Sequence, residues 1–587
     1  MKRKEQAIEA AVLLAASSLI YAVLFGGALV YDDEIYVAAD RIFNWRALFS
    51  RDYFTLTDER SFQPLVTALQ LLAAGNADLL RGFGVLLHAA NGVLVGALGR
   101  AAGLHPSAAF AAAVLFVLFP PATEVVAVAS FHGHLIVCFA TLSALLAWLS
   151  GKRGLSLAAL GLGLLSKESA VVIGPLILLC ELFFPSRKTR SARVWIGILA
   201  AATGLYLSFR FLVLAPPPPF ELPPAASPAG TLGWYASSLA VPWPLCIERT
   251  AADSSIGAFV LWVIGAVLIF ARGRAFALWV WPALALLPVL HFLPFANYSP
   301  VADRYLYAAS APLALFLCGI FYGPRGRIAL AMVALLWGAG SVYRTAFFRE
   351  PGRLYRQTAA CAPDNPRAHA LLGGWLYRVE DRAEKALSSF DKAFVHDPDM
   401  ISHFSDPGLV HRQPPSYVRG MLLLRLNRAQ EAAPLLLKAV LEAKSPINEA
   451  AARSKWGDAL AALGRTKEAI GQQLRAQVLL PAWAMPPLKL AVLHMDPRPK
   501  LALKNAKHAL ERSPTDQLSA RILSVKGDAH WRLKQSKKAE DAWRQSLSLV
   551  AFQPATMAAL ADLLEADGRG AEAESLRTEI RALLPLE

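Results

Sequence analysis

Cysteine is scarce in this chain of 587 residues, which contains only five. None of them forms a CxxC pair or has the cysteine–histidine spacing that is typical of a metal site. The five are Cys138, Cys180, Cys246, Cys318 and Cys361. Because they are widely scattered, and four lie within or beside apolar segments, the sequence predicts neither a disulfide framework nor a structural zinc site.

Long apolar runs are missing from the second half of the chain. Beyond residue 350 no run could cross the ~30 Å hydrocarbon core of a bilayer. Before residue 350 such runs recur between short charged loops, and the whole chain is 55% hydrophobic with a mean hydropathy of +0.40. This composition exceeds that of an ordinary soluble protein. We predict a membrane domain over residues 1–350, followed by a soluble domain over residues 351–587.

No DNA-binding or RNA-binding motif accompanies the formal net charge of +15. In the first half, the basic residues gather in alternate short loops between the apolar runs. These loops include residues 2–4, 152–153, 187–190, 272–274 and 325–327. Such an arrangement is the positive-inside pattern of membrane proteins, so the charge indicates topology and we expect no nucleic-acid partner.

The apolar runs predict an all-α polytopic bundle of about eleven transmembrane helices. The expected segments are 7–30, 80–100, 106–120, 132–150, 154–166, 168–185, 194–214, 255–271, 275–294, 305–322 and 328–345. The first lacks a convincing cleavage site and is interpreted as a retained anchor. With Lys2 in the cytoplasm, an odd number of spans puts the C-terminal domain on the outer side.

The soluble half contains repeats of about 34 residues. The first copy has the spacing of a tetratricopeptide repeat (TPR) at Gly374, Tyr377, Ala386, Phe390, Ala393 and Pro398. An insertion of about twelve residues separates the first two copies, and the later copies keep part of this pattern. The retained residues are Gly420, Ala432 and Ala439, then Gly457, Ala469, Ala476 and Pro481, and then Gly527, Ala539 and Trp543. Small residues let paired helices approach closely, so we expect a curved α-solenoid with a concave protein-binding face.

Three consecutive acids, Asp32, Asp33 and Glu34, follow the first apolar run. A carboxylate held at the bilayer surface can act as a general base where a lipid-borne substrate meets a soluble one. The alternative interpretation is a solvated end of the first helix.

Two further polar features lie within the apolar half. His88 and Asn91 share one face of a predicted helix, either in a site or as an interhelical hydrogen-bonding pair. Glu124 follows the helix break at Phe119-Pro120-Pro121, and either takes part in a site or caps backbone amides.

Cations on the expected outer side suit a bound phosphate. They are Lys167, Arg210 and Arg304, for which an ion pair of Lys167 with Glu168 and snorkelling of the arginines are the alternatives. His132 and His134 begin the fourth span, but no third ligand accompanies them, so we predict no metal site.

Several short motifs occur in a particular order along the chain. They are Tyr31-Asp32-Asp33, Ser61-Phe62-Gln63-Pro64-Leu65, His88-x-x-Asn91, Pro121-x-x-Glu124-x-Val126, Ser166-Lys167-Glu168-Ser169 and Ala302-Asp303-Arg304-Tyr305-Leu306-Tyr307. With the attached repeats, this order resembles the transmembrane and TPR O-mannosyltransferases and their bacterial relatives, within the GT-C glycosyltransferase superfamily. The chain departs from the family pattern at Gln63, where arginine is usual, and at His132 and His134.

The resemblance implies an inverting glycosyltransferase that uses a polyprenyl-phosphate-linked sugar and needs neither a metal nor a cofactor. It implies that Asp32 is the base and that Asp33 positions it, while Arg304, Arg210 and Lys167 bind the donor phosphate. The residues implied to shape the site are His88, Asn91, Glu124, Glu168, Arg60 and Tyr305. A protein acceptor or partner would bind the repeats.

Other functions remain open. The chain could be a non-enzymatic membrane scaffold whose repeats recruit envelope proteins, although eleven spans exceed what an anchor needs. A transporter is disfavoured because no span centre carries a charged relay. A GT-C enzyme acting on lipid or glycan is a further alternative. The composition favours a bacterial inner membrane, with the repeats in the periplasm, and the endoplasmic reticulum is an alternative location with the same topology.

Overall fold

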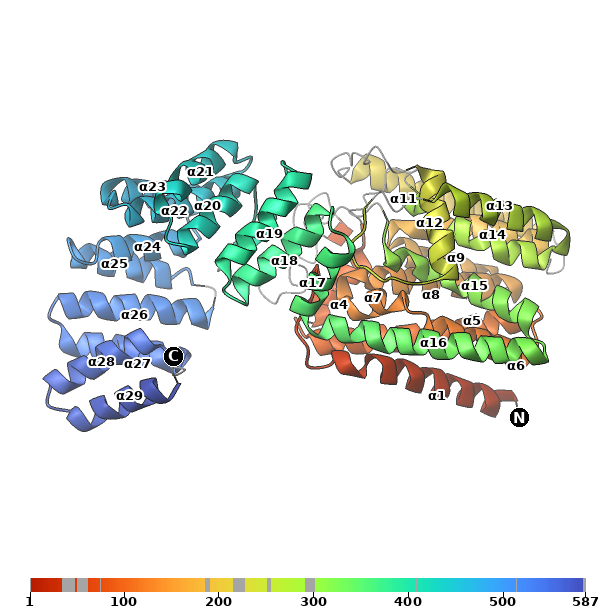
Figure 1. The fold of residues 1–587 in the computed structure, drawn as a ribbon, viewed down its shortest axis with the longest axis horizontal. Coiled ribbons are helices and arrows are strands. Elements are labelled where there is room, and N and C mark those ends of the chain that lie inside the picture. Colours follow the sequence, from red (N-terminus) through yellow and green to blue (C-terminus); the bar gives the residue numbers. More distant parts are fainter. Residues whose placement is uncertain are drawn as a thin grey trace. The chain divides into compact units, whose positions relative to one another are not determined.

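The computed structural model describes residues 2–33, 48–49, 62–73, 75–184, 190–214, 227–250, 255–290, 301–400, 402–406, 409–513 and 515–583. The chain divides into two compact units, Met1–Leu371 and Leu372–Glu587 (Figure 1). Helix α17 (Pro351–Cys361) therefore belongs to the first unit, although the hydropathy of the sequence placed the boundary near residue 350.

The first unit is a bundle of helices (Figure 1). As far as α10, its described helices are α1 (Lys2–Tyr21), α4 (Pro64–Ala73), α5 (Ala77–Ala101), α6 (Pro106–Leu118), α7 (Ala122–Ala127), α8 (His132–Leu149), α9 (Arg153–Leu164) and α10 (Ile173–Phe183). The following ones are α11 (Arg190–Ser208), α12 (Pro228–Ala240), α13 (Ile256–Ile269), α14 (Arg274–Leu286), α15 (Leu306–Phe321), α16 (Pro324–Arg349) and α17. Short 3₁₀ turns connect some of them.

Each of the eleven predicted segments overlaps a helix, but the prediction of eleven full spans is wrong for the part of the chain that the structure describes. Six helices are long and apolar enough to cross a membrane: Lys4–Leu24, Ala77–Ala101, Ala129–Leu149, Ser191–Val213, Asp303–Phe321 and Pro324–Arg349. The others are shorter because turns interrupt the apolar runs. For example, α6 ends at Leu118, just before Pro120 and Pro121, so its 13 residues extend only ~20 Å.

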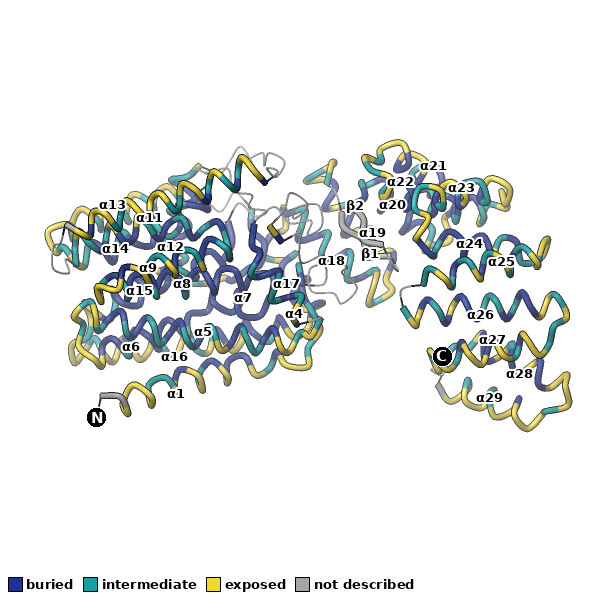
Figure 2. Tube along the Cα trace, turned by 180° about the vertical axis from the view of Figure 1, so that it is seen from behind, coloured by how far each residue is buried: buried dark blue, intermediate teal, exposed yellow. Residues whose placement is uncertain are grey.

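The exposed surface of this unit is compatible with membrane association. Helix α13 is apolar throughout and has no buried residue, and Figure 2 shows it exposed along much of its length. A helix that is apolar on every side is buried in a protein or lies in a membrane. Inside the bundle, Gly92 of α5 lets α6 approach closely, because a Cβ at that position would lie 2.6 Å from Val117 Cγ2.

The second unit is a stack of helical hairpins of the TPR type (Figure 1). Helix α18 (Pro366–Arg378) begins in the first unit and pairs with α19 (Ala383–His396). The later pairs are α20 (Pro415–Arg425) with α21 (Ala429–Glu442), α22 (Pro446–Ala462) with α23 (Thr466–Leu479), α24 (Met485–Leu493) with α25 (Pro499–Leu510), α26 (Asp516–Arg532) with α27 (Ser536–Leu549), and α28 (Pro554–Ala566) with α29 (Gly570–Leu583).

The insertion between the first two repeats is not helical. It forms an antiparallel β-hairpin of strands β1 (Ser402–Asp406) and β2 (Leu409–Gln413), in which Ser402 is paired with Gln413 and Asp406 with Leu409. This hairpin is a local exception in a chain whose described elements are otherwise helical, so the predicted all-α class is confirmed apart from the insertion.

Close packing within the repeats depends on the small residues that the sequence pattern picked out. A Cβ on Gly420 would lie 2.6 Å from Leu436 Cγ, and one on Gly457 would lie 2.7 Å from Gln473 Nε2. The first repeat differs from the expected register. Its tight glycine is Gly373, where a Cβ would lie 2.7 Å from Phe390 Cδ2, and not Gly374.

Candidate functional site

The acidic motif follows an irregular stretch after α1. Asp78 accepts hydrogen bonds from the Gly26 amide, and Arg81 donates to the carbonyl oxygen of Gly27 at 2.8 Å, so α5 holds this stretch in place. Tyr31 then adopts a φ of +59°, a left-handed conformation that is uncommon for a bulky residue. It is stabilised by a 2.7 Å hydrogen bond from its amide to the Tyr355 hydroxyl of α17. The two aspartates that follow have different partners.

Asp33 is a buried hydrogen-bond acceptor. Its carboxylate oxygens accept from the amides of Ala129 and Ser130, each at 2.7 Å, and also from the Ser130 hydroxyl. Asp33 therefore anchors the 3₁₀ turn Ala129–Phe131 that precedes α8. Burial raises the pKa of Asp33 to about 6, although the hydrogen bonds from Ser130 and Ala129 lower it in part.

Asp32 forms an ion pair with Arg367, with 2.6 Å between Oδ1 and Nη2. Its side chain remains 16% exposed, whereas Asp33 is 2% exposed. Arg367 also lies 3.3 Å from Glu248 and its guanidinium stacks 4.7 Å from the centre of the Tyr31 ring. Burial lowers the pKa of Arg367, but Tyr31, Asp32 and Glu248 outweigh this effect and raise it.

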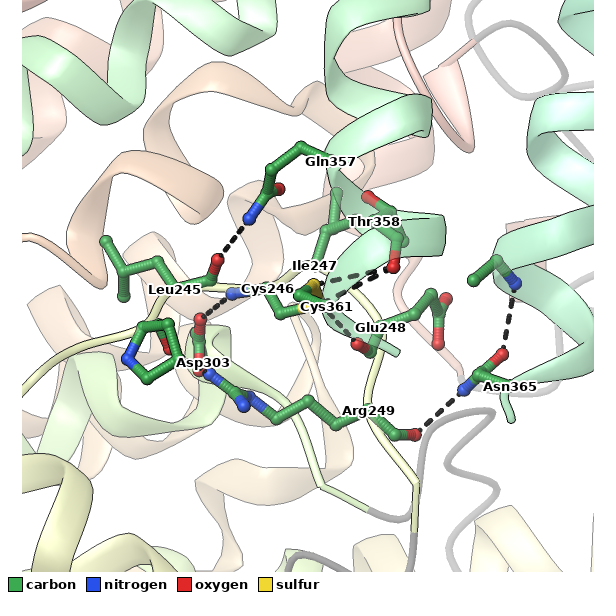
Figure 3. Close-up of a disulfide and its surroundings, with 12 residues drawn as sticks. Leu245, Cys246, Ile247, Glu248, Arg249, Asp303, Gln357, Thr358, Cys361 and Asn365 are labelled. Atoms are coloured by element: carbon green, nitrogen blue, oxygen red, sulfur yellow. Dashed lines mark hydrogen bonds and ion pairs between the residues drawn. A yellow bond between two sulfur atoms is a disulfide. The ribbon is translucent and has the colours of Figure 1, made fainter. Parts of the chain in front are cut away.

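Glu248 is the buried centre of this cluster. It is 1% exposed, accepts a hydrogen bond from the Tyr31 hydroxyl and pairs with Arg367. It belongs to the segment Leu245–Arg249, which follows α12 (Figure 3). Neither Glu248 nor Arg367 is predicted from the sequence, because each lies in a stretch without a motif.

A disulfide between Cys246 and Cys361 joins the segment Leu245–Arg249 to the end of α17 (Figure 3). The sequence analysis predicted no disulfide framework, and the Cys246–Cys361 disulfide shows that this prediction is wrong. The two cysteines are 115 residues apart, and only the folding of α17 beside the segment brings them together. Gln357 supports the same contact by donating to the carbonyl oxygen of Leu245 at 2.7 Å.

Asp303 holds the other side of this segment (Figure 3), and Arg304 also donates to it, at the carbonyl oxygen of Ile247. Asp303 accepts from the Cys246 amide at 2.8 Å and from Arg249 Nε at 3.1 Å. Arg304 pairs with Glu124 at 2.7 Å and lies over the Phe131 ring, 4.5 Å from its centre. The structure thus brings Asp32, Asp33, Glu124 and Arg304 into one region, around buried groups that balance their charges.

A second buried pair involves Glu168 and Arg210. Arg210 Nε lies 2.7 Å from Glu168 Oε1, and Glu168 also accepts from the Phe62 amide at 2.9 Å. The neighbouring Lys167 is half-buried, and its Nζ lies 2.9 Å from His134 Nε2. The His134 ring is 5.5 Å from the ring of Tyr305, which connects this group to Arg304.

His88 and Asn91 lie apart from these ion pairs, in the interior of the helix bundle. His88 Nε2 donates to the Val117 carbonyl oxygen at 3.1 Å, so its Nδ1 accepts from the Tyr307 hydroxyl at 2.8 Å. Asn91 donates to the same hydroxyl and to the Leu135 carbonyl oxygen, both at 3.0 Å. These contacts connect α5, α6, α8 and α15. Arg60 and Glu34 lie outside the described residues.

The arrangement has one partly open carboxylate above a buried network. Glu124, Glu168, Glu248 and Asp303 are each at most 3% exposed, so Asp32 is the most accessible acid of this group. Within the described ranges, no group of three or more histidine, cysteine or acidic side chains is placed to hold a metal ion. Chemically, the cluster offers an oriented, partly exposed carboxylate surrounded by compensated charges.

No protein-family model and no curated protein sequence matches this chain. Solved structures of TPR proteins resemble part of it. TTC0263, a thermophilic TPR protein of Thermus thermophilus, is 18% identical with a TM-score of 0.28, over 34% of this chain and 98% of its own. PilF of Pseudomonas aeruginosa is 16% identical with a TM-score of 0.29, and the match covers 38% of this chain and 93% of PilF. YrrB, a TPR protein with an unusual peptide-binding site, is 16% identical with a TM-score of 0.24, and the match covers 35% of this chain and 98% of YrrB.

Proposed function

We propose that the first unit is an inverting glycosyltransferase that uses a polyprenyl-phosphate-linked sugar, with Asp32 as the general base. The observation that carries this proposal is the contrast between two adjacent acids. The Asp33 carboxylate accepts three hydrogen bonds, from the amides of Ala129 and Ser130 and from the Ser130 hydroxyl. Asp32 is oriented by Arg367 and stays partly exposed. A base must reach the proton that it removes, and Asp32 meets that requirement better.

In this reaction, Asp32 takes the proton from an acceptor hydroxyl. The oxygen attacks the anomeric carbon of the sugar, the bond from that carbon to the lipid phosphate breaks with inversion, and the phosphate leaves with the bonding electrons. Arg367 positions the carboxylate, and Glu248 in turn positions Arg367 through their 3.3 Å contact. This chain of contacts supports a fixed direction for the Asp32 carboxylate.

Lys167 is one candidate to meet the leaving phosphate, because its half-buried ammonium carries a positive charge. Arg304 and Arg210 each pair at 2.7 Å with a buried carboxylate, so much of their charge is compensated. Lys167 is half-buried, and its Nζ lies beside the imidazole of His134. We assign Arg304 and Arg210 to the supporting electrostatics, with Glu124, Glu168 and Tyr305 beside them, and His88 and Asn91 to the packing of the bundle.

The repeat unit is assigned to the binding of a protein acceptor or partner, since stacked helical hairpins provide an extended surface of this kind. On this proposal the chain lies in a bacterial inner membrane with its repeats in the periplasm. A disulfide between Cys246 and Cys361 favours an oxidising compartment for the segment around Glu248.

The test is transfer by the purified full chain from a panel of polyprenyl-phosphate sugars, followed by mass spectrometry of lipid and acceptor products. We expect donor turnover with the wild type and none with Asp32→Asn. Asp381→Asn is the control, because it removes the carboxylate of an exposed Asp–Arg pair in the repeat unit, 2.8 Å from Arg425. Equal turnover by Asp32→Asn and the wild type contradicts the proposal.

A second candidate is a non-enzymatic membrane scaffold, which the stack of TPR hairpins favours. It predicts no turnover with any donor, together with retention of a protein partner that depends on residues 372–587. Transfer to a lipid or glycan in the same assay points instead to a GT-C enzyme with a different acceptor.

A further inference from the structure

An open cavity of about 460 Å³ lies where several helix ends of the first unit meet. Its walls come from the turn between α5 and α6, the end of α10, the turn between α13 and α14, and the end of α15. In Figure 1, the turn between α13 and α14 is at the end of the bundle opposite α7 and α17. The cavity is therefore separate from the region around Asp32.

The cavity is positively charged. Two arginines, Arg272 and Arg274, line it, and none of the lining residues that the structure describes is acidic. Both arginines are exposed, and neither forms an ion pair with any acid that the structure describes. Arg274 donates to the carbonyl oxygen of Ala102 at 3.3 Å, which leaves most of its five donors for another partner. Positive charge is expected in the basic loops of a membrane protein, and in this loop the charge lies at the edge of a cavity.

Backbone groups add to this charge. Helices α6 and α14 both begin at the cavity, at Pro106 and Arg274. The His105 side chain accepts from the Ser107 amide of α6, and the other amides of the two first turns have no partner inside the helix. Helix N-termini attract anions for this reason. Gly103, at a φ of +93°, lets Arg274 approach: a Cβ there would lie 3.0 Å from Arg274 Nη1. The end of α5 thus holds this guanidinium at the rim.

The remaining wall is apolar. Leu278 of α14 and Phe316 and Ile320 of α15 line it, and Ile320 is 38% exposed. These side chains continue along helices that are apolar along most of their length. A ligand that fits this combination has an anionic head at the arginines and a hydrocarbon chain along the helices.

We propose that this cavity binds the phosphate group of an anionic membrane lipid. Arg272 and Arg274 contact the phosphate oxygens, the N-termini of α6 and α14 face the same group, and the acyl chains run along Leu278 and Ile320. The volume falls in the range of small-ligand sites, about 300–1,000 Å³. A soluble phosphate shares the charge of this ligand but does not use the apolar wall.

The test is native mass spectrometry of the full chain in detergent, with equimolar phosphatidylglycerol and phosphatidylcholine of identical acyl chains. We expect preferential retention of phosphatidylglycerol. Replacing both cavity arginines, Arg272→Gln with Arg274→Gln, should weaken its retention roughly tenfold, because each basic residue near a lipid phosphate contributes to binding. Equal retention of the two lipids by the wild type overturns the proposal without any variant.

The matched control is the double variant Lys152→Gln, Arg325→Gln. Both of these residues are exposed cations of basic loops that do not line the cavity. We expect less than a twofold change in retention. If the control loses as much phosphatidylglycerol as the cavity variant, the effect is one of overall charge and the site is rejected. Displacement of the lipid by millimolar inorganic phosphate identifies a soluble anion as the occupant and overturns the lipid assignment. Because all four replaced side chains are exposed, both double variants should fold, and their elution volumes in size-exclusion chromatography should match that of the wild type.

Discussion

Arg367, in the first turn of α18, reaches back across 335 residues to pair with Asp32 at 2.6 Å. The same guanidinium contacts Glu248 and the face of Tyr31. A single cation therefore connects the acidic motif after α1 to the disulfide-linked segment Leu245–Arg249.

The two aspartates should respond differently to the loss of charge. Asp32→Asn keeps the shape of the side chain but cannot accept a proton at neutral pH, so we expect transfer to fall at least ~100-fold in folded protein. Asp33→Asn places an amide NH₂ where the structure needs an acceptor, because Ala129 and Ser130 both donate there. We expect it mainly to lower the thermal unfolding temperature. Turnover and unfolding are measured on the same preparations, and the reverse outcome would exchange the two roles.

Arg367 should act through the position of Asp32. Arg367→Lys keeps one positive charge but cannot contact Asp32, Glu248 and the Tyr31 ring with a planar fork. We expect turnover to fall in both variants, and to fall less in Arg367→Lys than in Arg367→Ala. Arg419→Lys is the control, since it alters an exposed pair with Asp391 in the repeat unit. Full activity of Arg367→Ala would remove Arg367 from the positioning of the base.

The disulfide makes a prediction about chemical labelling. Alkylation of the unfolded, unreduced chain should modify three cysteines, Cys138, Cys180 and Cys318, and prior reduction should raise the number to five. Intact mass gives both counts. We expect the double variant Cys246→Ser, Cys361→Ser to lose about 2–5 kcal/mol of unfolding free energy. Five modified cysteines without reduction would show that this disulfide does not form.

Close helix packing in the repeats should depend on Gly527. A Cβ on this residue would overlap the indole of Trp543, which is 1% exposed and cannot move without opening the α26–α27 contact. We expect Gly527→Ala to increase hydrogen exchange across these helices. Gly471→Ala is the matched control, because a Cβ there meets nothing within 4 Å, and alanine favours a helix. Equal exchange in the two variants would contradict this packing.

The burial of Asp33 should make stability depend on pH. Its pKa in the folded protein is about 6, above the ordinary value of 3.8. Between these values the folded chain binds more protons at this carboxyl than the unfolded chain, so its contribution to stability falls as pH rises through this window. Asp33→Asn should lack this component. The test is the difference in unfolding temperature between the two proteins from about pH 4 to pH 7, and a difference that does not change with pH argues against the raised pKa.

Part of this organisation follows from sequence alone, because the relevant interactions are local. Apolar runs and a repeat of about 34 residues are periodic, and helices form wherever such patterns occur. The sequence therefore determined the helical character of both units and the tight glycines of the later repeats, but it picked Gly374 instead of Gly373 in the first repeat. It overestimated the number of full spans, because a hydropathy run does not show where a turn such as that after Leu118 shortens a helix.

The contacts of the candidate site were decided by tertiary structure. The acids, Lys167 and the arginines of the motifs could be found as polar residues in apolar surroundings, but their partners could not. Glu248 lies 217 residues from Tyr31, and Cys246 lies 115 residues from Cys361. No local pattern encodes pairs so distant, since they exist only when α17 and the segment Leu245–Arg249 pack beside the acidic motif. That packing also gives different surroundings to Asp32 and Asp33, which as neighbours in sequence look alike.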